Sequence, residues 1–266
     1  MAASPVSVAA APAGALPQTC GAAVPPVAWI RPGQVGYIGP DLGVGLHAAS
    51  VAVLSVGLDA PFTLEVAGHG ATTVRSAYAP ARTPHRVVAP EGRILLLFID
   101  PVGVPAVHAA AAMQRQAGPC GLDHRLEDEL IAACQHGTDL DRLRSLAGPP
   151  VPGTADRRIS RLAGDIRADP GRSFRADETA SRLGLSTSHF LRLFAQHTGT
   201  TFRRYQQWAR LLHAARGTTA GHDLTRCAAD AGFASPSHLS DTFQRTFGTS
   251  PTAALLTSSV QLDLDF

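Results

Sequence analysis

Short runs of β-branched and apolar residues, each bounded by Gly, Pro or Asp, occupy much of the first hundred positions. They lie at 51–56 (VAVLSV), 62–66 (FTLEV), 72–74 (TTV) and 94–99 (ILLLFI). Short runs separated by turn residues about every 8–12 positions are typical of a small β-sandwich or β-barrel. We therefore predict a β-domain that begins near residue 27.

The spacing of apolar residues becomes helical after position 104. The segments 104–116 and 123–135 are both predicted to be helices, and the second one turns three consecutive acids away from its apolar face. The prolines of 148–153 (GPPVPG) cannot continue a helix and mark a linker. The rest of the chain is predicted to form helices. The predicted division is a disordered leader at 1–26, a β-domain with C-terminal helices at 27–147, a linker at 148–155, a helical domain at 156–256 and a tail at 257–266.

Two stretches of the helical half resemble each other. TASRLGL at 179–185 precedes STSHFLRLF at 186–194, and CAADAGF at 227–233 precedes ASPSHLSDTF at 234–243. In each stretch an Ala stands four residues before a Gly, as Ala180 before Gly184 and Ala228 before Gly232. A small Ala lets a second helix cross closely, and the Gly can take a left-handed turn. This pattern predicts two helix-turn-helix units.

The second helix of each unit has a cap, an apolar stripe and a polar face. Ser186 begins the first of these helices, and Ser235 with Pro236 begins the other. The predicted buried stripes are Phe190, Leu193 and Phe194, and then Leu239, Thr242 and Phe243. The opposite faces carry Ser188, His189, Arg192 and Gln196, and then Ser237, His238, Ser240, Asp241 and Arg245. A helix with such donors on one face fits a DNA major groove about 12 Å wide.

The distribution of charge supports a polyanionic partner. The chain has a net charge of +2, and all 23 of its Lys and Arg residues are Arg. Positions 157–250 hold 14 Arg against 7 Asp and Glu, whereas 119–151 hold 3 Arg against 6. A locally basic half beside a near-neutral half indicates that the C-terminal part meets the polyanion.

On these residues the C-terminal half, from Asp156 to about Leu255, resembles the AraC-type transcription regulators. The resemblance is carried most closely by the ending GFASPSH at 232–238, Phe243 and FGTSP at 247–251. It implies two helix-turn-helix subdomains joined by a long helix, with recognition helices in successive major grooves roughly 34 Å apart. More loosely, Pro84-His85 and Ile99-Asp100-Pro101 are similar to the family's cupin-like effector and dimerisation domain. The implied fold is α+β and multidomain.

The resemblance implies a cytoplasmic, sequence-specific DNA-binding regulator of transcription, modulated by a small-molecule effector in the β-domain. Its implied partners are double-stranded promoter DNA, RNA polymerase and a second copy of the chain, with no membrane and no cofactor. Two alternatives stay open. One is a constitutive regulator whose N-terminal domain only dimerises, and the other is a metal-dependent cupin enzyme activity in that domain.

The candidate DNA contacts differ in their expected roles. Arg192 is expected to bind a guanine with two hydrogen bonds, and the alternative is a phosphate contact. Ser188, His189 and Gln196 are further base contacts, whereas Ser186, Arg203, Arg204 and Arg245 are placed for phosphates. Between the units, Phe202, Tyr205, Trp208, Ala209, Leu212 and Ala215 recur at helical spacing and are expected to form core.

The chain departs from the family pattern at four places. Leu191 stands before Arg192 where a polar residue is common, and Asp241 stands where Arg is common. Asp241 could accept from a cytosine amino group but repels phosphate, so the second helix should read different DNA or bind weakly. Arg175 at a cap position, and Gly217-Thr218 near the end of the joining helix, predict local fraying.

Other chemistry finds little support in the sequence. His47, His69, His85 and His108 are isolated, so no metal site is expected, although His85 could offer a hydrogen bond to an effector. The sequence holds no nucleophile elbow, phosphate loop or paired-carboxylate motif, so we expect no enzyme. Cys20, Cys120, Cys134 and Cys227 form no CxxC and are expected to be reduced, with Cys227 in the core. The apolar runs are too short to cross a bilayer.

Overall fold

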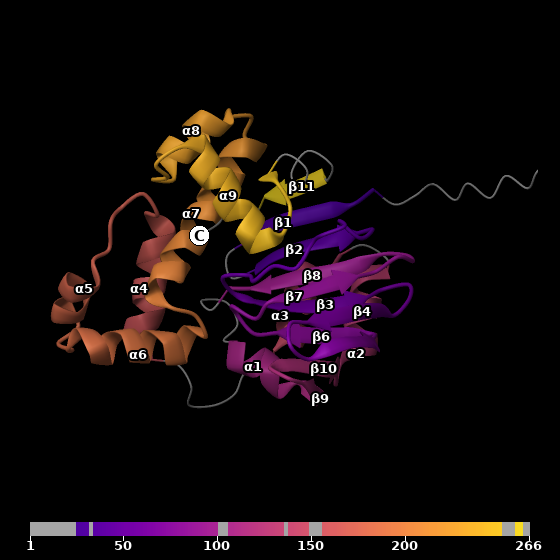
Figure 1. Cartoon of the computed structure of the whole chain (residues 1–266). Helices are drawn as coiled ribbons and strands as arrows, with labels where there is room; N and C mark the ends of the chain where they lie inside the picture. The colour runs from indigo at the N-terminus through magenta and orange to yellow at the C-terminus, as the bar shows by residue number, and fades with distance from the viewer. Residues whose placement is uncertain are drawn as a thin grey trace, which may run out of the picture.

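The computed structural model describes residues 25–31, 34–100, 106–135, 138–148, 156–251 and 259–262. Almost all of the predicted leader, with Cys20, lies outside these residues, as does the linker apart from Gly148. The described residues form a sheet-rich N-terminal domain followed by a helical C-terminal domain, which confirms the predicted mixture of α and β (Figure 1).

The N-terminal domain contains two sheets. Its strands are β1 (Val27–Arg31), β2 (Gln34–Gly39), β3 (Ala52–Gly57), β4 (Phe62–Val66), β5 (Gly70–Val74), β6 (Ser76–Ala79), β7 (His85–Val88), β8 (Ile94–Ile99), β9 (Met113–Ala117) and β10 (Cys120–His124). The larger sheet has the order β11-β1-β2-β8-β3-β6-β10-β9, in which β11 (Ser259–Leu262) comes from near the end of the chain. The smaller sheet has the order β5-β4-β7. The runs predicted at 62–66 and 94–99 form strands with those bounds.

One predicted helix is largely wrong. Only α1 (Ala106–Ala111) is helical within 104–116, and β9 and β10 follow it as an antiparallel hairpin. The second helix, α2 (Glu127–Gln135), begins four residues later than the predicted start at 123. Pairing of β10 with β6 overrides the local helical spacing, because it buries Cys120 and Leu122 completely beside Phe62 and Leu64.

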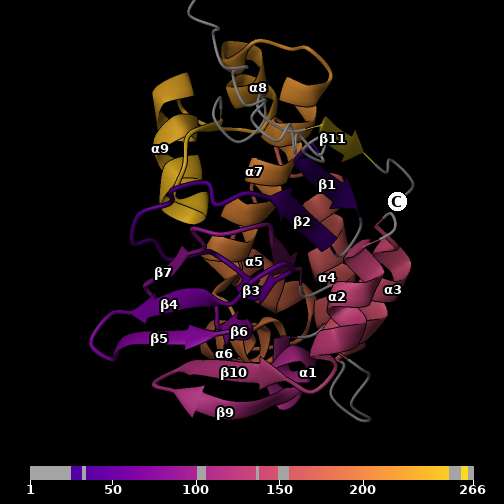
Figure 2. The same ribbon diagram turned by 90° about the vertical axis from the view of Figure 1, so that its right-hand side faces the viewer.

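The larger sheet is covered on both faces (Figure 2). Leu54 and Leu97 pack in one cluster with residues of α2 and of α3 (Leu140–Ala147). Val53 and Phe98 have the opposite orientation and pack with residues of the C-terminal helices. Because side chains alternate along a strand, the same strands serve both cores. The two domains therefore share a continuous hydrophobic cluster.

The helical domain contains α4 (Arg157–Ala168), α5 (Ala176–Arg182), α6 (Thr187–Thr198), α7 (Phe202–Thr219), α8 (Leu224–Asp230) and α9 (Pro236–Phe247). After α9, the short strand β11 (Ser259–Leu262) pairs in parallel with β1, so part of the predicted tail returns to the N-terminal sheet. This strand was not predicted from the sequence.

The joining helix α7 forms the predicted core. Tyr205 and Trp208 are completely buried, and Phe202 is 3% exposed. The fraying predicted at Gly217-Thr218 is wrong, because α7 runs through both residues to Thr219. A Cβ on Gly217 would lie 2.8 Å from the sulfur of Cys227, so the glycine permits close packing of α8. Cys227 is buried, as predicted.

Candidate nucleic-acid interface

The first helix-turn-helix unit consists of α5, a tight turn and α6. Gly184 has a φ of +68°, in the left-handed region that the sequence pattern predicted. The N–H of Leu185 donates to the carbonyl of Ala180 over 2.9 Å and closes the turn. Ser186 is the N-cap of α6, and its hydroxyl accepts from the N–H of His189 over 3.3 Å. Arg175 caps α5 without a side-chain hydrogen bond.

The second unit repeats this geometry in α8 and α9. Gly232 has a φ of +72°, and the N–H of Phe233 donates to the carbonyl of Ala228 over 2.8 Å. The hydroxyl of Ser235 accepts from the N–H of His238 over 3.1 Å, and Pro236 occupies the first turn of α9. The matching hydrogen bonds at both turns confirm the internal repeat.

The predicted stripes are buried except for Leu193, which is half-buried, and the predicted contact faces are mainly exposed. Phe190 and Phe194 are completely buried, and Leu239 and Phe243 are nearly so. The exposed candidates are Ser186, Ser188, His189, Arg192, Gln196, Ser237, His238, Asp241 and Arg245, whereas Pro236 and Ser240 are half-buried. Leu191, next to Arg192, is 39% exposed and adds an apolar side chain to this face of α6. Both helices thus have solvent-facing polar surfaces.

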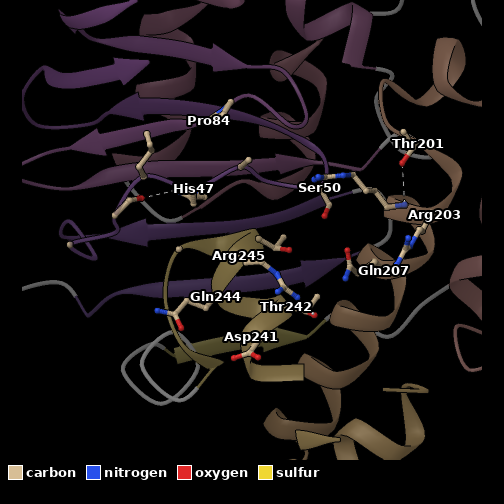
Figure 3. A pocket seen from close by; sticks show the side chains of 17 residues that line it. His47, Ser50, Pro84, Thr201, Arg203, Gln207, Asp241, Thr242, Gln244 and Arg245 are labelled. Carbon is tan, nitrogen blue, oxygen red and sulfur yellow. Dashed lines mark hydrogen bonds between the residues drawn. The ribbon is translucent and has the colours of Figure 1, made fainter. Parts of the chain in front are cut away.

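A cleft with a volume of about 1120 Å³ adjoins α9. Arg203, Arg204 and Gln207 of α7 line it, as do Asp241 and Arg245 of α9. The cleft brings the two predicted phosphate contacts of α7 together with part of the predicted face of α9. Figure 3 shows the side chains of Arg245, Gln207 and Arg203 directed toward this space.

The other wall of the cleft comes from the N-terminal domain. Gly43, Gly45 to Ala48, Ser50 and Pro84 line this side, which Figure 3 shows opposite α9. Thr200, just before α7, fixes the wall because its hydroxyl donates to the carbonyl of Ser50 over 2.7 Å. The sequence reading missed this wall, since no local pattern in 43–50 indicates a contact with residues 150 positions away.

The structure brings together two histidines that the sequence reading treated as isolated. The rings of His47 and His85 have centroids 5.0 Å apart, and both line a small cavity of about 30 Å³. The Nδ1 atoms donate to the carbonyls of Gly45 and Thr83. Burial lowers the pKa of both rings, to about 4 for His85. Among the described residues, no three His, Cys, Asp or Glu side chains are grouped so as to hold a metal ion.

A second cavity, of about 80 Å³, lies between the sheet and the helical domain. Its lining is mainly apolar and includes Trp29, Phe98, Leu212, Phe243 and Phe247. The indole Nε1 of Trp29 is buried and has no hydrogen-bond partner among the described residues. The Trp29 side chain packs with Leu54 and Leu97 on the other face of the sheet, so this donor belongs to that core and the cavity itself has mainly apolar walls.

Comparisons with known proteins agree with this geometry. Residues 179–255 match the family described as "Helix-turn-helix domain". Apo ToxT K231A from Vibrio cholerae is 14% identical, with a TM-score of 0.56 over 85% of this chain and 98% of that one. ToxT from the same organism with bound unsaturated fatty acid is 11% identical, with a TM-score of 0.54 over 85% of this chain and 95% of that one.

An AraC-type transcriptional regulator from Chromobacterium violaceum is 23% identical over 37% of this chain and 89% of that one, with a TM-score of 0.35. No curated protein matches the chain. Among the described residues, no helix has both the length and the apolar character needed to cross a membrane. The C-terminal part of this chain, residues 179–255, is a helix-turn-helix domain of the AraC type, within a chain that shares the overall fold of ToxT.

Proposed function

We propose that this protein is a sequence-specific DNA-binding regulator of transcription. The observation that carries the proposal is the tandem pair of helix-turn-helix units, each with a capped second helix and an exposed polar face. The excess of Arg over acids across 157–250 supports it, because phosphate attraction supplies most sequence-independent affinity. The base contacts proposed for α6 and α9 supply the discrimination.

The proposal has further parts. The DNA is a promoter, the chain acts in the cytoplasm as a homodimer that communicates with RNA polymerase, and it catalyses no reaction. Binding as a dimer would double the number of contacted grooves and so the length of the site. The resemblance in sequence and the helix-turn-helix family support these roles.

We propose that the effector is an apolar carboxylic acid bound between the domains. ToxT has been crystallised with an unsaturated fatty acid and with (E)-4-(8-methylnaphthalen-1-yl)but-3-enoic acid. The apolar cavity beside Trp29 fits the chemistry of such a chain, although its 80 Å³ requires the domains to move apart for a full-length ligand. A ligand that binds the opened arrangement more tightly would shift the population of domain arrangements. His85, in the neighbouring cavity, is a candidate hydrogen-bond partner.

In vitro selection of random duplexes by the full-length protein tests the central proposal. We expect a recovered motif with two recognition elements about 10 base pairs apart, one for each helix. Selection with Arg192→Ala should lose conservation at one position of the first element. Recovery of no motif, or of a motif confined to one groove, would contradict the proposal that α6 and α9 are a pair of recognition helices.

Thermal unfolding of the full chain with saturated and unsaturated fatty acids of increasing length tests the effector proposal. A ligand that binds the folded chain raises the melting temperature in a concentration-dependent manner. Replacing Leu212 with Trp, which fills the apolar cavity, should abolish that shift. No shift with any acid would favour a constitutive regulator whose N-terminal domain only dimerises.

A further inference from the structure

A charged residue, Arg82, lies next to the N-terminal wall of the cleft, outside the residues that line it. Arg82 lies in the turn between β6 and β7, and its backbone N–H donates to the carbonyl of Ala49 over 2.9 Å. Ala48, Ser50 and Pro84, which lie beside this hydrogen bond in the chain, line the cleft. Arg82 is exposed. The turn therefore places a solvent-facing guanidinium at the edge of the cleft.

Positive charges from both domains face one another at this place. Burial, and then the charge of Arg82, lower the pKa of Arg204. Arg203 and Arg245 line the same cleft. In the part of the chain that the structure describes, none of these four guanidinium groups has a carboxylate within 4.0 Å. Such a cluster repels itself, and an anion in the cleft would relieve the repulsion.

We propose that the N-terminal domain forms part of the DNA-binding surface, with Arg82 holding the sugar–phosphate backbone in the cleft together with Arg203, Arg204 and Arg245. This inference rests on the proposed DNA-binding function and extends it to a domain outside the helix-turn-helix units. The loop at 43–50 is then the second wall of a groove for one DNA strand.

The character of the cleft favours a DNA backbone over a small free anion. Pockets for small molecules enclose about 300–1000 Å³ and are mostly apolar and aromatic. This cleft measures about 1120 Å³, and His47 has the one aromatic ring among the described residues that line it. Leu46 is the one large apolar side chain among the same described lining residues, and it is 61% exposed. Interfaces with DNA are instead polar, positively charged and hydrated.

The position of the cleft also suits a DNA strand. A helix in the major groove lies between two phosphate backbones, so residues along its flank meet phosphates. Asp241, Gln244 and Arg245 place one flank of α9 in the cleft. A strand beside this flank passes between α7 and the N-terminal wall, within reach of cations on both sides.

Binding of a duplex recovered by selection, measured with the full chain at several salt concentrations, tests the inference. The variant is Arg82→Asn, because Asn tolerates the φ of +71° at this position and keeps the backbone N–H. We expect affinity to fall about three- to tenfold for the operator and its single-base variants alike. The negative slope of log K against log salt should become shallower by about 0.9. Arg82→Lys should restore the slope.

The matched control is Arg144→Gln, which removes the same charge from an exposed position on α3, across the sheet from the helical domain. It should leave the slope unchanged. Arg204→Gln should make the slope shallower by about as much as Arg82→Asn does, and the double variant should make it shallower by about twice that amount. Equal slopes for Arg82→Asn, Arg144→Gln and the unmodified chain would overturn the inference while leaving the proposed function intact.

Three other results would also overturn it. Tighter DNA binding by Arg82→Asn would mean that the N-terminal wall excludes DNA. Stabilisation of the unmodified chain, but not of Arg82→Asn, by inorganic pyrophosphate, with equal DNA binding by both, would identify a free anion as the occupant. Absence of DNA binding by the unmodified chain would overturn both this inference and the proposed function.

Discussion

The carboxylate of Asp100 accepts a hydrogen bond from the indole N–H of Trp208 over 3.2 Å, and the two residues belong to different domains. The same carboxylate accepts from the hydroxyl of Tyr205 over 3.2 Å and from Nη1 of Arg167 over 3.3 Å. Asp100 follows β8 and is completely buried. One side chain of the N-terminal domain therefore binds two helices, α4 and α7, of the helical domain.

Replacing Asp100 with Asn should destabilise the whole chain. The isosteric amide leaves no cavity, but it removes the charge that compensates the largely buried guanidinium of Arg167. Breaking one side of a buried pair costs about 3–5 kcal/mol. Urea unfolding should show this loss, whereas Asp123→Asn, which breaks an exposed pair with Arg115, should cost less than about 1 kcal/mol. Equal effects of the two variants would show that the buried network contributes no more than a surface pair.

The sequence was most informative where structure depends on neighbouring residues. The turns at Gly184 and Gly232 and the caps at Ser186 and Ser235 could be predicted, because φ preference and capping are local properties. The stripe of α7 was also predictable from its period. These features locate the exposed faces of the two recognition helices, α6 and α9.

Features that depend on distant contacts could not be predicted in this way. The hairpin of β9 and β10 has helical spacing in sequence but is held by β6. The cleft requires the loop at 43–50 to lie beside α9, almost 200 positions later. Asp100 offered one usable signal, an acid directly after the apolar strand at 94–99, but its partners on α4 and α7 had none.

The buried His85 should make stability depend on pH. Its folded pKa is about 4, because burial disfavours the charged ring, whereas an unfolded His titrates near 6.5. Between these values the unfolded chain binds the proton more readily, so stability should fall as the pH drops from about 6.5 to about 4. The full span corresponds to about 3 kcal/mol.

His85→Gln provides the test of this pH effect, because Gln keeps a donor and does not titrate. The free energy of unfolding of this variant should vary less between pH 7 and pH 5 than that of the unmodified chain. His69→Gln, at an exposed position, is the control and should leave the pH profile unchanged. The same profile in all three proteins would rule out His85 as the origin of the pH dependence.

Arg192 should determine the identity of one base. Its side chain is exposed on α6, on the same polar face as Ser188, His189 and Gln196. Replacement by Ala should cost about 1–3 kcal/mol against the preferred operator and should remove discrimination at one base pair. Measured affinities for the four base pairs at each position provide the readout, and Arg144→Ala is the control for charge. A uniform loss at all positions would assign Arg192 to a phosphate.

Asp241 should weaken DNA binding in the native chain. It is exposed on α9 and lines the cleft with Arg245, so its carboxylate faces the space where a phosphate backbone would lie. A negative charge there offsets part of the attraction from the neighbouring arginines. Asp241→Asn should therefore bind the selected duplex about three- to tenfold more tightly and show a steeper dependence on salt.

The comparison with Asp241→Ala separates repulsion from base recognition. If the carboxylate only repels phosphate, Ala and Asn should tighten binding equally, and Asp128→Asn on α2, across the sheet, should have little effect. If Asp241 accepts from a cytosine amino group, Ala should lose about 1–3 kcal/mol at a single base pair, while Asn retains an acceptor. We expect the first outcome, because the cleft places Asp241 among cations that bind backbone, and a base-specific loss with Ala would refute it.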